Sequence, residues 1–132
     1  MKILLVDDDP IVILLQKKLM EKAGIPNPVI AFNSGDDALE YLLKSTDYLE
    51  DHLVFLDINM PGLTGWEVLD TLAERELKLK LKVIIITSSI EDSDQKKAAG
   101  YDVIVDFWIK PFSIGDFINL RESQLFKNDL GE

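Results

Sequence analysis

The 132-residue sequence predicts a doubly wound α/β fold, in which a parallel sheet is covered by helices on both faces. Two observations lead to this prediction. Short apolar runs that suit strands alternate five times with segments whose apolar residues have helical spacing. The apolar runs are continuous rather than alternating, which is typical of strands buried on both faces of a parallel sheet.

Composition limits the kind of protein this is. Hydrophobic residues make up 47% and charged residues 29%, an ordinary globular balance, and no repeat or linker interrupts residues 1–132, so we expect one domain. The formal net charge of -10 argues against direct nucleic-acid binding. The absence of cysteine excludes disulfides and thiolate metal sites. No apolar run is long enough to insert into a membrane or to form a signal peptide, so we expect a cytoplasmic protein.

The first strand and helix are predicted at residues 3–6 and 11–23. The strand ends in three acids, and the third, Asp9, suits the N-cap of a helix with Pro10 at its first position. Gly24 is the expected stop. Helical spacing predicts an inner face made of Ile11, Leu14, Leu15 and Leu19.

Residues 29–32 predict the second strand, and Ser34 with Asp37 has the spacing of a helix cap. The following helix is expected to bury Ala38, Leu39, Leu42 and Leu43. The polar residues 45–52 are predicted to form a loop, and His52, the only histidine, is interpreted as a solvated residue of that loop.

Residues 53–56 predict the third strand, which ends at Asp57. Pro61, Gly62 and Gly65 indicate an immediate turn. Thr64 and Glu67 then form a capping box, opening a third helix whose end within residues 74–82 is uncertain. Its expected inward residues are Val68, Leu69, Leu72 and Ala73.

The last part of the chain predicts two more strand and helix units. Residues 83–86 form a fourth strand ending at Thr87, and the polar segment 91–100 predicts the least stable helix. Residues 107–109 predict the fifth strand, ending at Lys110 and Pro111. The last helix is expected to be capped by Ser113 and Asp116 and to carry Ile114, Phe117, Ile118 and Leu125.

The carboxyl ends of the predicted strands carry the chemistry, because ligands of doubly wound sheets bind beyond these ends. An acidic cluster without Cys or His suits Mg²⁺, and a hydroxyl and an ammonium group can hold phosphoryl oxygens. Asp57 is the remaining candidate nucleophile. Each residue alone also suits an ordinary role as a cap, a strand-end polar residue or a solvated charge. The set consists of Asp7, Asp8, Asp57, Thr87 and Lys110.

Four motifs together resemble the receiver domain of bacterial two-component response regulators: VDDDP, LDINMPGLTG, IITSS and IKPF. The resemblance runs from Lys2 to about Phe126 and implies a flavodoxin-like sheet of strand order 2-1-3-4-5 with five helices. It implies that Asp57 is the phospho-acceptor. It also implies that Asp8 ligates Mg²⁺ directly, Asp7 mainly through water, and Asn59 through its backbone carbonyl.

The resemblance further implies that Thr87 is a switch hydroxyl, that Lys110 contacts the phosphoryl group, and that the bond between Lys110 and Pro111 is cis. The switch aromatic corresponds to Phe107, which departs from the family in lacking a hydroxyl. A second departure is the long link from Tyr101 to Ile109, which leaves the start of the fifth strand open.

The implied function is a phosphorylation-dependent switch in a two-component phosphorelay. A histidine kinase or histidine phosphotransfer protein would supply the phosphoryl group, and a downstream protein target would read the result. Such a domain catalyses its own phosphorylation and dephosphorylation and is not a turnover enzyme. The chain ends about where the last helix should, so we expect no output domain, although a piece of a longer protein would look the same.

Two rival interpretations remain at this stage. A haloacid-dehalogenase-type phosphohydrolase also uses a strand-end Asp with Mg²⁺ and lysine, but that resemblance requires a second Asp where Asn59 stands. A degenerate receiver acting only as a binding module is the other.

The fourth helix, fifth strand and fifth helix are expected to form the output surface. Neighbouring strand residues alternate in direction, so Phe107 and Trp108 cannot share one face. We expect that one of them is exposed, or else that the second packs as extra core.

Overall fold

The computed structural model describes residues 1–44, 51–75, 80–88, 91–123 and 126. Within these residues, a five-stranded parallel sheet has the order β2-β1-β3-β4-β5, which confirms the predicted fold and strand order. In chain order the elements are β1 (Lys2–Val6), α1 (Pro10–Lys22), β2 (Val29–Phe32), α2 (Gly35–Lys44), β3 (Asp51–Asp57), α3 (Gly65–Glu74), β4 (Lys80–Thr87), α4 (Asp92–Ala98), β5 (Ile104–Ile109) and α5 (Ile114–Glu122).

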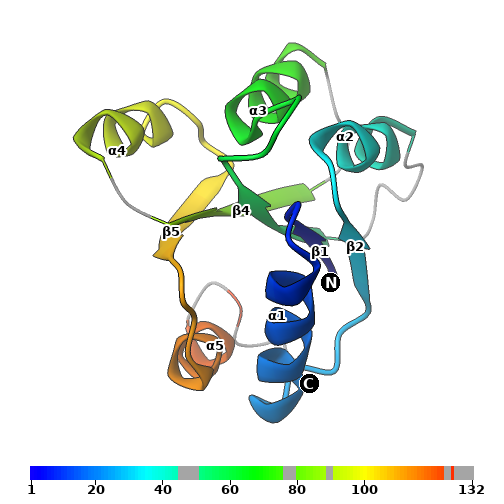
Figure 1. Cartoon of the computed structure of the whole chain (residues 1–132), viewed down its shortest axis with the longest axis vertical. Coiled ribbons are helices and arrows are strands. Elements are labelled where there is room, and N and C mark those ends of the chain that lie inside the picture. The colour runs from blue at the N-terminus through cyan, green and yellow to red at the C-terminus, as the bar shows by residue number, and fades with distance from the viewer. Residues whose placement is uncertain (45–50, 76–79, 89–90, 124–125, 127–132) are drawn as a thin grey trace.

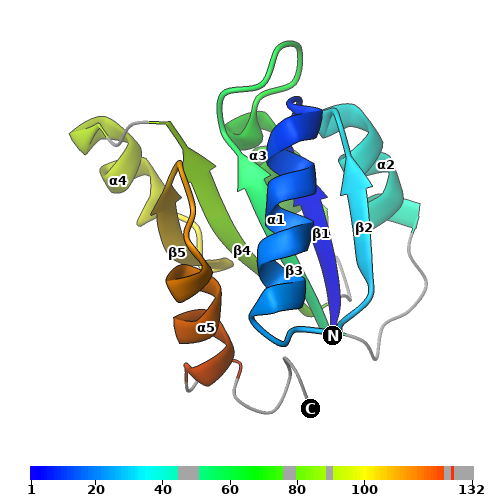
Figure 2. The ribbon, with the colours of Figure 1, turned by 60° about the horizontal axis from the view of Figure 1, so that its bottom comes forward.

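Helices cover both faces of the sheet. Figure 1 shows α1 and α5 on one face and α2, α3 and α4 on the other. Two hydrophobic cores result, one beneath α1 and α5 and one beneath α2 and α3. All strands run in one direction, so their carboxyl ends lie together at the upper edge in Figure 2. Among the described residues, no helix has the length and apolar character needed to cross a membrane.

The predicted helix starts are confirmed by side-chain caps. The Asp9 side chain accepts a hydrogen bond from the backbone of Ile11, and both Thr64 and Ser113 open complete capping boxes. The hydroxyl of Ser34 accepts from the backbone of Asp37 at 3.2 Å. After α1, Gly24 has φ +79°, a conformation that residues with a side chain rarely adopt.

The prediction that His52 is a solvated loop residue is wrong. β3 begins at Asp51, so His52 lies within the strand, paired in register with Lys2 of β1 and Leu81 of β4, and it is fully buried. The sheet is also longer than predicted in β4 and β5, which begin at Lys80 and Ile104. The polar beginnings of β3 and β4 pair with each other along the sheet, Asp51 with Lys80, a long-range contact that local apolar runs do not indicate.

The buried face of α1 is mostly not the predicted one. Of the four predicted residues only Leu19 packs against the core, while Ile11 is 74% exposed, Leu14 54% and Leu15 40%; Gln16 and Met20 are buried instead. The first turns of this helix are apolar on almost every side, so two faces satisfy the helical spacing. The face that packs on the sheet is the one that includes Gln16.

Most other inward-facing predictions are confirmed. In α3, Val68, Leu69 and Leu72 are buried, but Ala73 is exposed. In α5, Phe117 is buried and Ile114 is 39% exposed. Leu125 lies outside the described residues.

The two β5 aromatics point to opposite faces and both are half-buried. Phe107 packs against the core beneath α2 and α3. Trp108 packs against Phe55, Phe112 and Phe117 on the other side, with ring centroids 5.4, 5.8 and 5.1 Å away. Neither is fully exposed, because helices cover both faces of the sheet, and each packs against one of the two cores.

Candidate functional site

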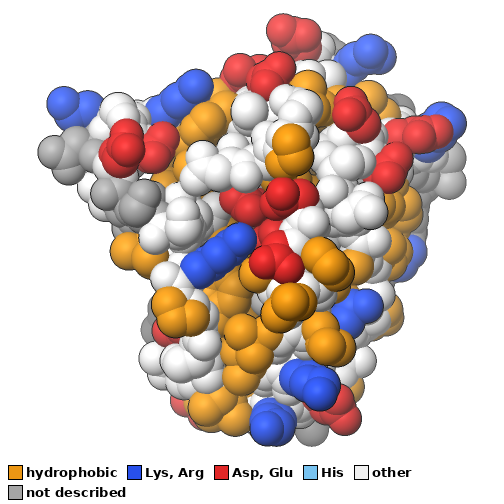
Figure 3. Space-filling view, viewed as in Figure 1, with side chains coloured by type: hydrophobic (Ala, Val, Ile, Leu, Met, Phe, Trp, Pro, Cys, Tyr) orange, Lys and Arg blue, Asp and Glu red, His pale blue; other side chains and the backbone are white. Residues whose placement is uncertain are grey.

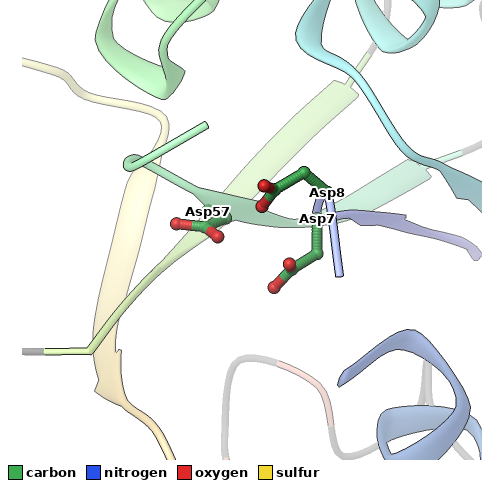
Figure 4. A group of neighbouring side chains, drawn as sticks. All are labelled: Asp7, Asp8 and Asp57. Carbon is green, nitrogen blue, oxygen red and sulfur yellow. The ribbon is translucent and has the colours of Figure 1, made fainter. Parts of the chain in front are cut away.

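Three carboxylates meet where the central strands end. Asp57 is the last residue of β3, and Asp7 and Asp8 follow β1, the neighbouring strand. One oxygen from each lies within 4.8 Å of the others. Asp7 and Asp57 are only 1% and 3% exposed, while Asp8 is exposed. Figure 4 shows the Asp8 carboxylate reaching toward Asp57 from the end of β1. The predicted acidic cluster is therefore formed.

Backbone groups of the turns orient the two buried carboxylates. The N–H of Asp9 donates to Oδ1 of Asp7 at 2.9 Å, and the N–H of Asn59 donates to Oδ1 of Asp57 at 2.8 Å. In each case the donor lies two residues after the acid, a local pattern that Asp readily makes. The backbone N–H groups that follow β1 and β3 thus hold one oxygen of each carboxylate in place.

Lys110 supplies the positive charge. Its Nζ lies 2.8 Å from Oδ2 of Asp7 and 3.2 Å from Oδ2 of Asp57, so one ammonium group bridges both acids. The bond between Lys110 and Pro111 is cis, as expected. β5 ends at Ile109, directly before the lysine.

The pKa values reflect burial and mutual charge. Burial raises the pKa of the Asp7 carboxyl above its ordinary value, and the charge of Asp57 adds to this, while hydrogen bonds from Lys110 and the Asp9 backbone oppose it. Burial alone would lower the pKa of Lys110, but its hydrogen bond with Asp7 and the charges of both acids raise it. The lysine is therefore a fixed cation at neutral pH.

Thr87 completes the site at the end of β4. It is fully buried, and its Oγ1 accepts a hydrogen bond from Nδ2 of Asn59 at 3.2 Å. Its carbonyl accepts the N–H of Lys110 at 2.8 Å. Thr87 is thus linked through hydrogen bonds to the turn after β3 and to the end of β5.

The residues present fit a magnesium ion. All candidate ligands are oxygens, two of the three carboxylates are buried, and neither Cys nor His is near them in the described residues. Mg²⁺ prefers carboxylate and carbonyl oxygens and retains several waters, which the exposed side at Asp8 would admit.

Two features of the site were not predicted from the sequence. One is the hydrogen bond from the Asn59 side chain to Thr87, because the resemblance implies a role only for the Asn59 backbone. The other is the close packing of α3 on the end of β3. A Cβ on Gly65 would lie 2.8 Å from the Asp57 carbonyl oxygen and 2.8 Å from Cα of Ile58. The only sequence signal for this contact is a glycine at the start of the helix.

The predicted switch aromatic lies further from the strand ends. Thr87 pairs with Ile109 in the sheet. Phe107 pairs with Ile85, so this pair lies two residues before the Thr87 pair in each strand, on the same face. Phe107 is therefore not among the groups that surround the carboxylates.

Comparison with known proteins identifies the family. Residues 3–121 match the family model described as response regulator receiver domain. The chain is 32% identical over 126 residues, 95% of its length, to the transcriptional regulatory protein HprR of Escherichia coli K12, covering 52% of that protein. It is 34% identical over 122 residues, 89% of its length, to the hybrid signal transduction histidine kinase L of Dictyostelium discoideum, covering 7% of that protein. The chain thus spans about half or less of these two relatives.

Comparison with solved structures points to the same family. A two-component response regulator from Cytophaga hutchinsonii superposes with a TM-score of 0.76 at 28% identity, covering 92% of this chain and 93% of that one. Taken with the acidic pocket at the strand ends, these matches show that the chain belongs to the response regulator receiver domain family of two-component systems.

Proposed function

We propose that residues 1–132 form a single receiver domain that acts as a phosphorylation-dependent switch, with Asp57 as the phospho-acceptor. The observation that carries this proposal is the environment of the Asp57 carboxylate. It is buried at the end of the central strand, with the ammonium of Lys110 on one side and the acids at the end of β1 on the other. A carboxylate in this setting has a cation to receive the phosphoryl oxygens and acids to hold a metal ion.

In the proposed reaction, a carboxylate oxygen of Asp57 attacks the phosphorus of a phosphohistidine on the donor. A P–O bond forms as the P–N bond breaks, and the electron pair of the broken bond stays with the imidazole nitrogen. Lys110 would transfer its contact from Asp57 to a phosphoryl oxygen, and in-line geometry would be set by the rigid strand ends.

The metal site would comprise Asp7, Asp8 and Asp57 together with the backbone carbonyl of Asn59. Bound Mg²⁺ would neutralise the acids and the charge on the transferred group. Deprotonated carboxylates are required for this role, and Lys110 favours them in the free protein by pairing with two of the three.

Signalling would follow from a change at Thr87. The Thr87 hydroxyl oxygen accepts from Asn59 Nδ2, and a charged phosphoryl oxygen would be a strong acceptor for its O–H, so the hydroxyl would turn toward the phosphoryl group. Phe107, on the neighbouring strand, would respond to the space that Thr87 leaves. Phosphorylation would thereby shift an equilibrium between two conformations, because the phosphoryl group interacts more favourably with one of them.

The donor would be a histidine kinase or a histidine phosphotransfer protein, and the recipient a downstream protein. The surface beside the pocket suits a protein partner. Figure 3 shows acidic side chains at the centre of this face with a basic side chain beside them and hydrophobic side chains over α1 below. The exposed apolar residues of α1 are Ile11, Leu14 and Leu15. Apolar side chains in such a group suit a protein contact, and a net charge of -10 disfavours nucleic acid. We place this exchange in the cytoplasm.

The decisive experiment is intact-mass analysis with a small-molecule phosphodonor, with and without Mg²⁺. We expect one Mg²⁺-dependent phosphoryl adduct on the wild type and none on Asp57→Asn, which keeps nearly the same shape without the nucleophile. Asp51→Asn, at the opposite end of the same strand, is the control and should be modified normally. An adduct on Asp57→Asn at the wild-type extent would contradict the assignment.

Further measurements on the wild-type protein distinguish the two rival functions, a phosphohydrolase and a degenerate receiver. Sustained release of phosphate from small phosphoesters would favour a hydrolase, and absence of any adduct together with absence of Mg²⁺ binding would favour a degenerate receiver.

A further inference from the structure

α4 is held mainly by its C-terminal end. The helix has only seven residues, Asp92–Ala98, and none of its described side chains is buried. Its N-cap residue, Glu91, makes no side-chain capping bond. A short, exposed and uncapped helix has little intrinsic stability, so its position depends on the contacts that its ends make.

Those contacts are with α3, on the same face of the sheet (Figure 1). The ring of Tyr101, just after α4, stacks on Trp66 with centroids 5.7 Å apart and an interplanar angle of 25°. The Tyr101 hydroxyl donates a hydrogen bond to Oδ1 of Asp70. Nζ of Lys97 lies 5.2 Å from the centroid of the Trp66 ring, a cation–π contact. We call Trp66, Asp70, Lys97 and Tyr101 the α3–α4 cluster.

The α3–α4 cluster is joined directly to the acceptor site. Trp66 follows Gly65, whose backbone packs so closely on the Asp57 carbonyl and on Ile58 that a Cβ would not fit. At its other end, α4 begins a few residues after Thr87. The helix is therefore linked to the site at both ends, through α3 and through β4.

We propose that the α3–α4 cluster acts as a brake on the switch: it holds α4 in its unphosphorylated position and so opposes the movement of Thr87 toward a phosphoryl group. This inference rests on the proposed function. In this proposal the cluster forms only in the unphosphorylated arrangement, so weakening it favours the phosphorylated one. By thermodynamic reciprocity, the strength of the cluster then sets how tightly the acceptor site holds a phosphoryl group.

The cluster contains a hydrogen bond that can be deleted by removing a single oxygen atom, the Tyr101 hydroxyl. The hydrogen bond to Asp70 raises the pKa of Tyr101 to about 12, with burial a smaller cause, so the hydroxyl stays protonated at neutral pH. Tyr101→Phe deletes this hydrogen bond and retains the stacked ring. Lys97→Met deletes the cation over Trp66 and retains the aliphatic chain.

The test uses these two variants with matched controls. Tyr41→Phe removes a tyrosine hydroxyl on α2, and Lys96→Met removes the neighbouring lysine of α4. The first measurement is amide hydrogen exchange of α4 without ligand, which should be faster in Tyr101→Phe and Lys97→Met than in the wild type or the controls. The second is the affinity for beryllium trifluoride with Mg²⁺, which should be about two- to tenfold tighter in Tyr101→Phe.

The outcomes separate the brake from the phosphorylation chemistry. Unchanged α4 exchange in Tyr101→Phe would show that the cluster does not hold the helix. Faster exchange with an unchanged affinity for beryllium trifluoride would show that the helix is held but not coupled to the site, which also overturns the proposal. Failure of the wild type to bind beryllium trifluoride would contradict the proposed function itself, and with it any coupling, whatever the exchange result.

Discussion

At the scale of single residues, Lys110 compensates the charge of the two buried acids. It is the only side chain among the described residues that forms an ion pair with the two buried acids, Asp7 and Asp57. Carboxylates that are 1% and 3% exposed depend on such a partner, because an unpaired buried charge is strongly unfavourable.

Lys110→Met should therefore lower the free energy of unfolding by about 3 kcal/mol in the absence of Mg²⁺, since two buried acids lose their shared cation. Urea unfolding in the presence of a chelator measures this. Lys44→Met is the control, because the Lys44 pair with Glu40 has side chains that are 75% and 60% exposed, and its loss should hardly matter. Equal effects from the two substitutions would show that Lys110 does not compensate buried charge.

The residues of the site could be predicted because the fold brings the ends of parallel strands together whatever the detailed packing. Asp7, Asp57, Thr87 and Lys110 all follow apolar runs, and the structure places all four in one pocket. His52 could not be placed in the same way. Its strand begins with polar residues whose burial depends on pairing with β1 and β4, a long-range contact that no local pattern indicates.

At the scale of elements, α1 shows where helical spacing fails. With apolar residues on nearly every side, spacing favours the face with the most hydrophobic residues, yet the structure buries Gln16 instead. Gln16 is 0% exposed, and neither polar atom of its side chain has a hydrogen-bond partner among the described residues. A buried amide in this state reduces stability.

Gln16→Met, which has a similar length and no hydrogen-bonding groups, should raise the free energy of unfolding by about 1 to 2 kcal/mol. Thermal or urea unfolding tests this, with Lys18→Met, an exposed position of the same helix, expected to change stability by less than about 0.5 kcal/mol. A loss of stability in Gln16→Met would mean that the amide is satisfied in solution.

α3 provides the second prediction at this scale, because its first residue packs against the end of β3, which carries the proposed phospho-acceptor. Gly65→Ala places a Cβ 2.8 Å from backbone atoms of Asp57 and Ile58, so the helix must shift, at a cost of about 1 to 3 kcal/mol. Phosphorylation of Asp57 should slow as well, since the strand end moves. Stability and intact-mass time courses measure the two effects.

Gly115→Ala is the matched control. The nearest atom to a Cβ there is Oγ of Ser113 at 3.5 Å, an ordinary contact, and alanine favours the helix, so this variant should gain up to about 1 kcal/mol. A Gly65→Ala variant that is as stable and as reactive as Gly115→Ala would refute the close packing.

At the scale of the whole molecule, the acidic cluster would link folding to the proposed metal binding. The proposed ligands come from the ends of β1 and β3 and meet only when these strands are paired, so Mg²⁺ would bind the folded state selectively. Saturation at about 100 times the dissociation constant should raise the free energy of unfolding by about 2.7 kcal/mol.

Asp8→Asn should abolish most of this gain, while stabilising the metal-free protein slightly by removing one charge from the pocket. Because Asp8 is exposed, the substitution does not disturb the core. Differential scanning calorimetry with and without Mg²⁺ compares the variant with the wild type. A full Mg²⁺-dependent increase in Asp8→Asn would show that Asp8 is not a ligand.

The order of the site residues along the chain has a consequence for protein synthesis. The acids are made first and the lysine last, with Asp7 and Lys110 more than a hundred positions apart. A ribosome that stalls before β5, or a protease that removes the C-terminal third, leaves a fragment with the carboxylates of Asp7 and Asp57 but without the cation that pairs with both. Under the proposed function, such a fragment lacks the group that receives the phosphoryl oxygens, so damaged copies would give no signal.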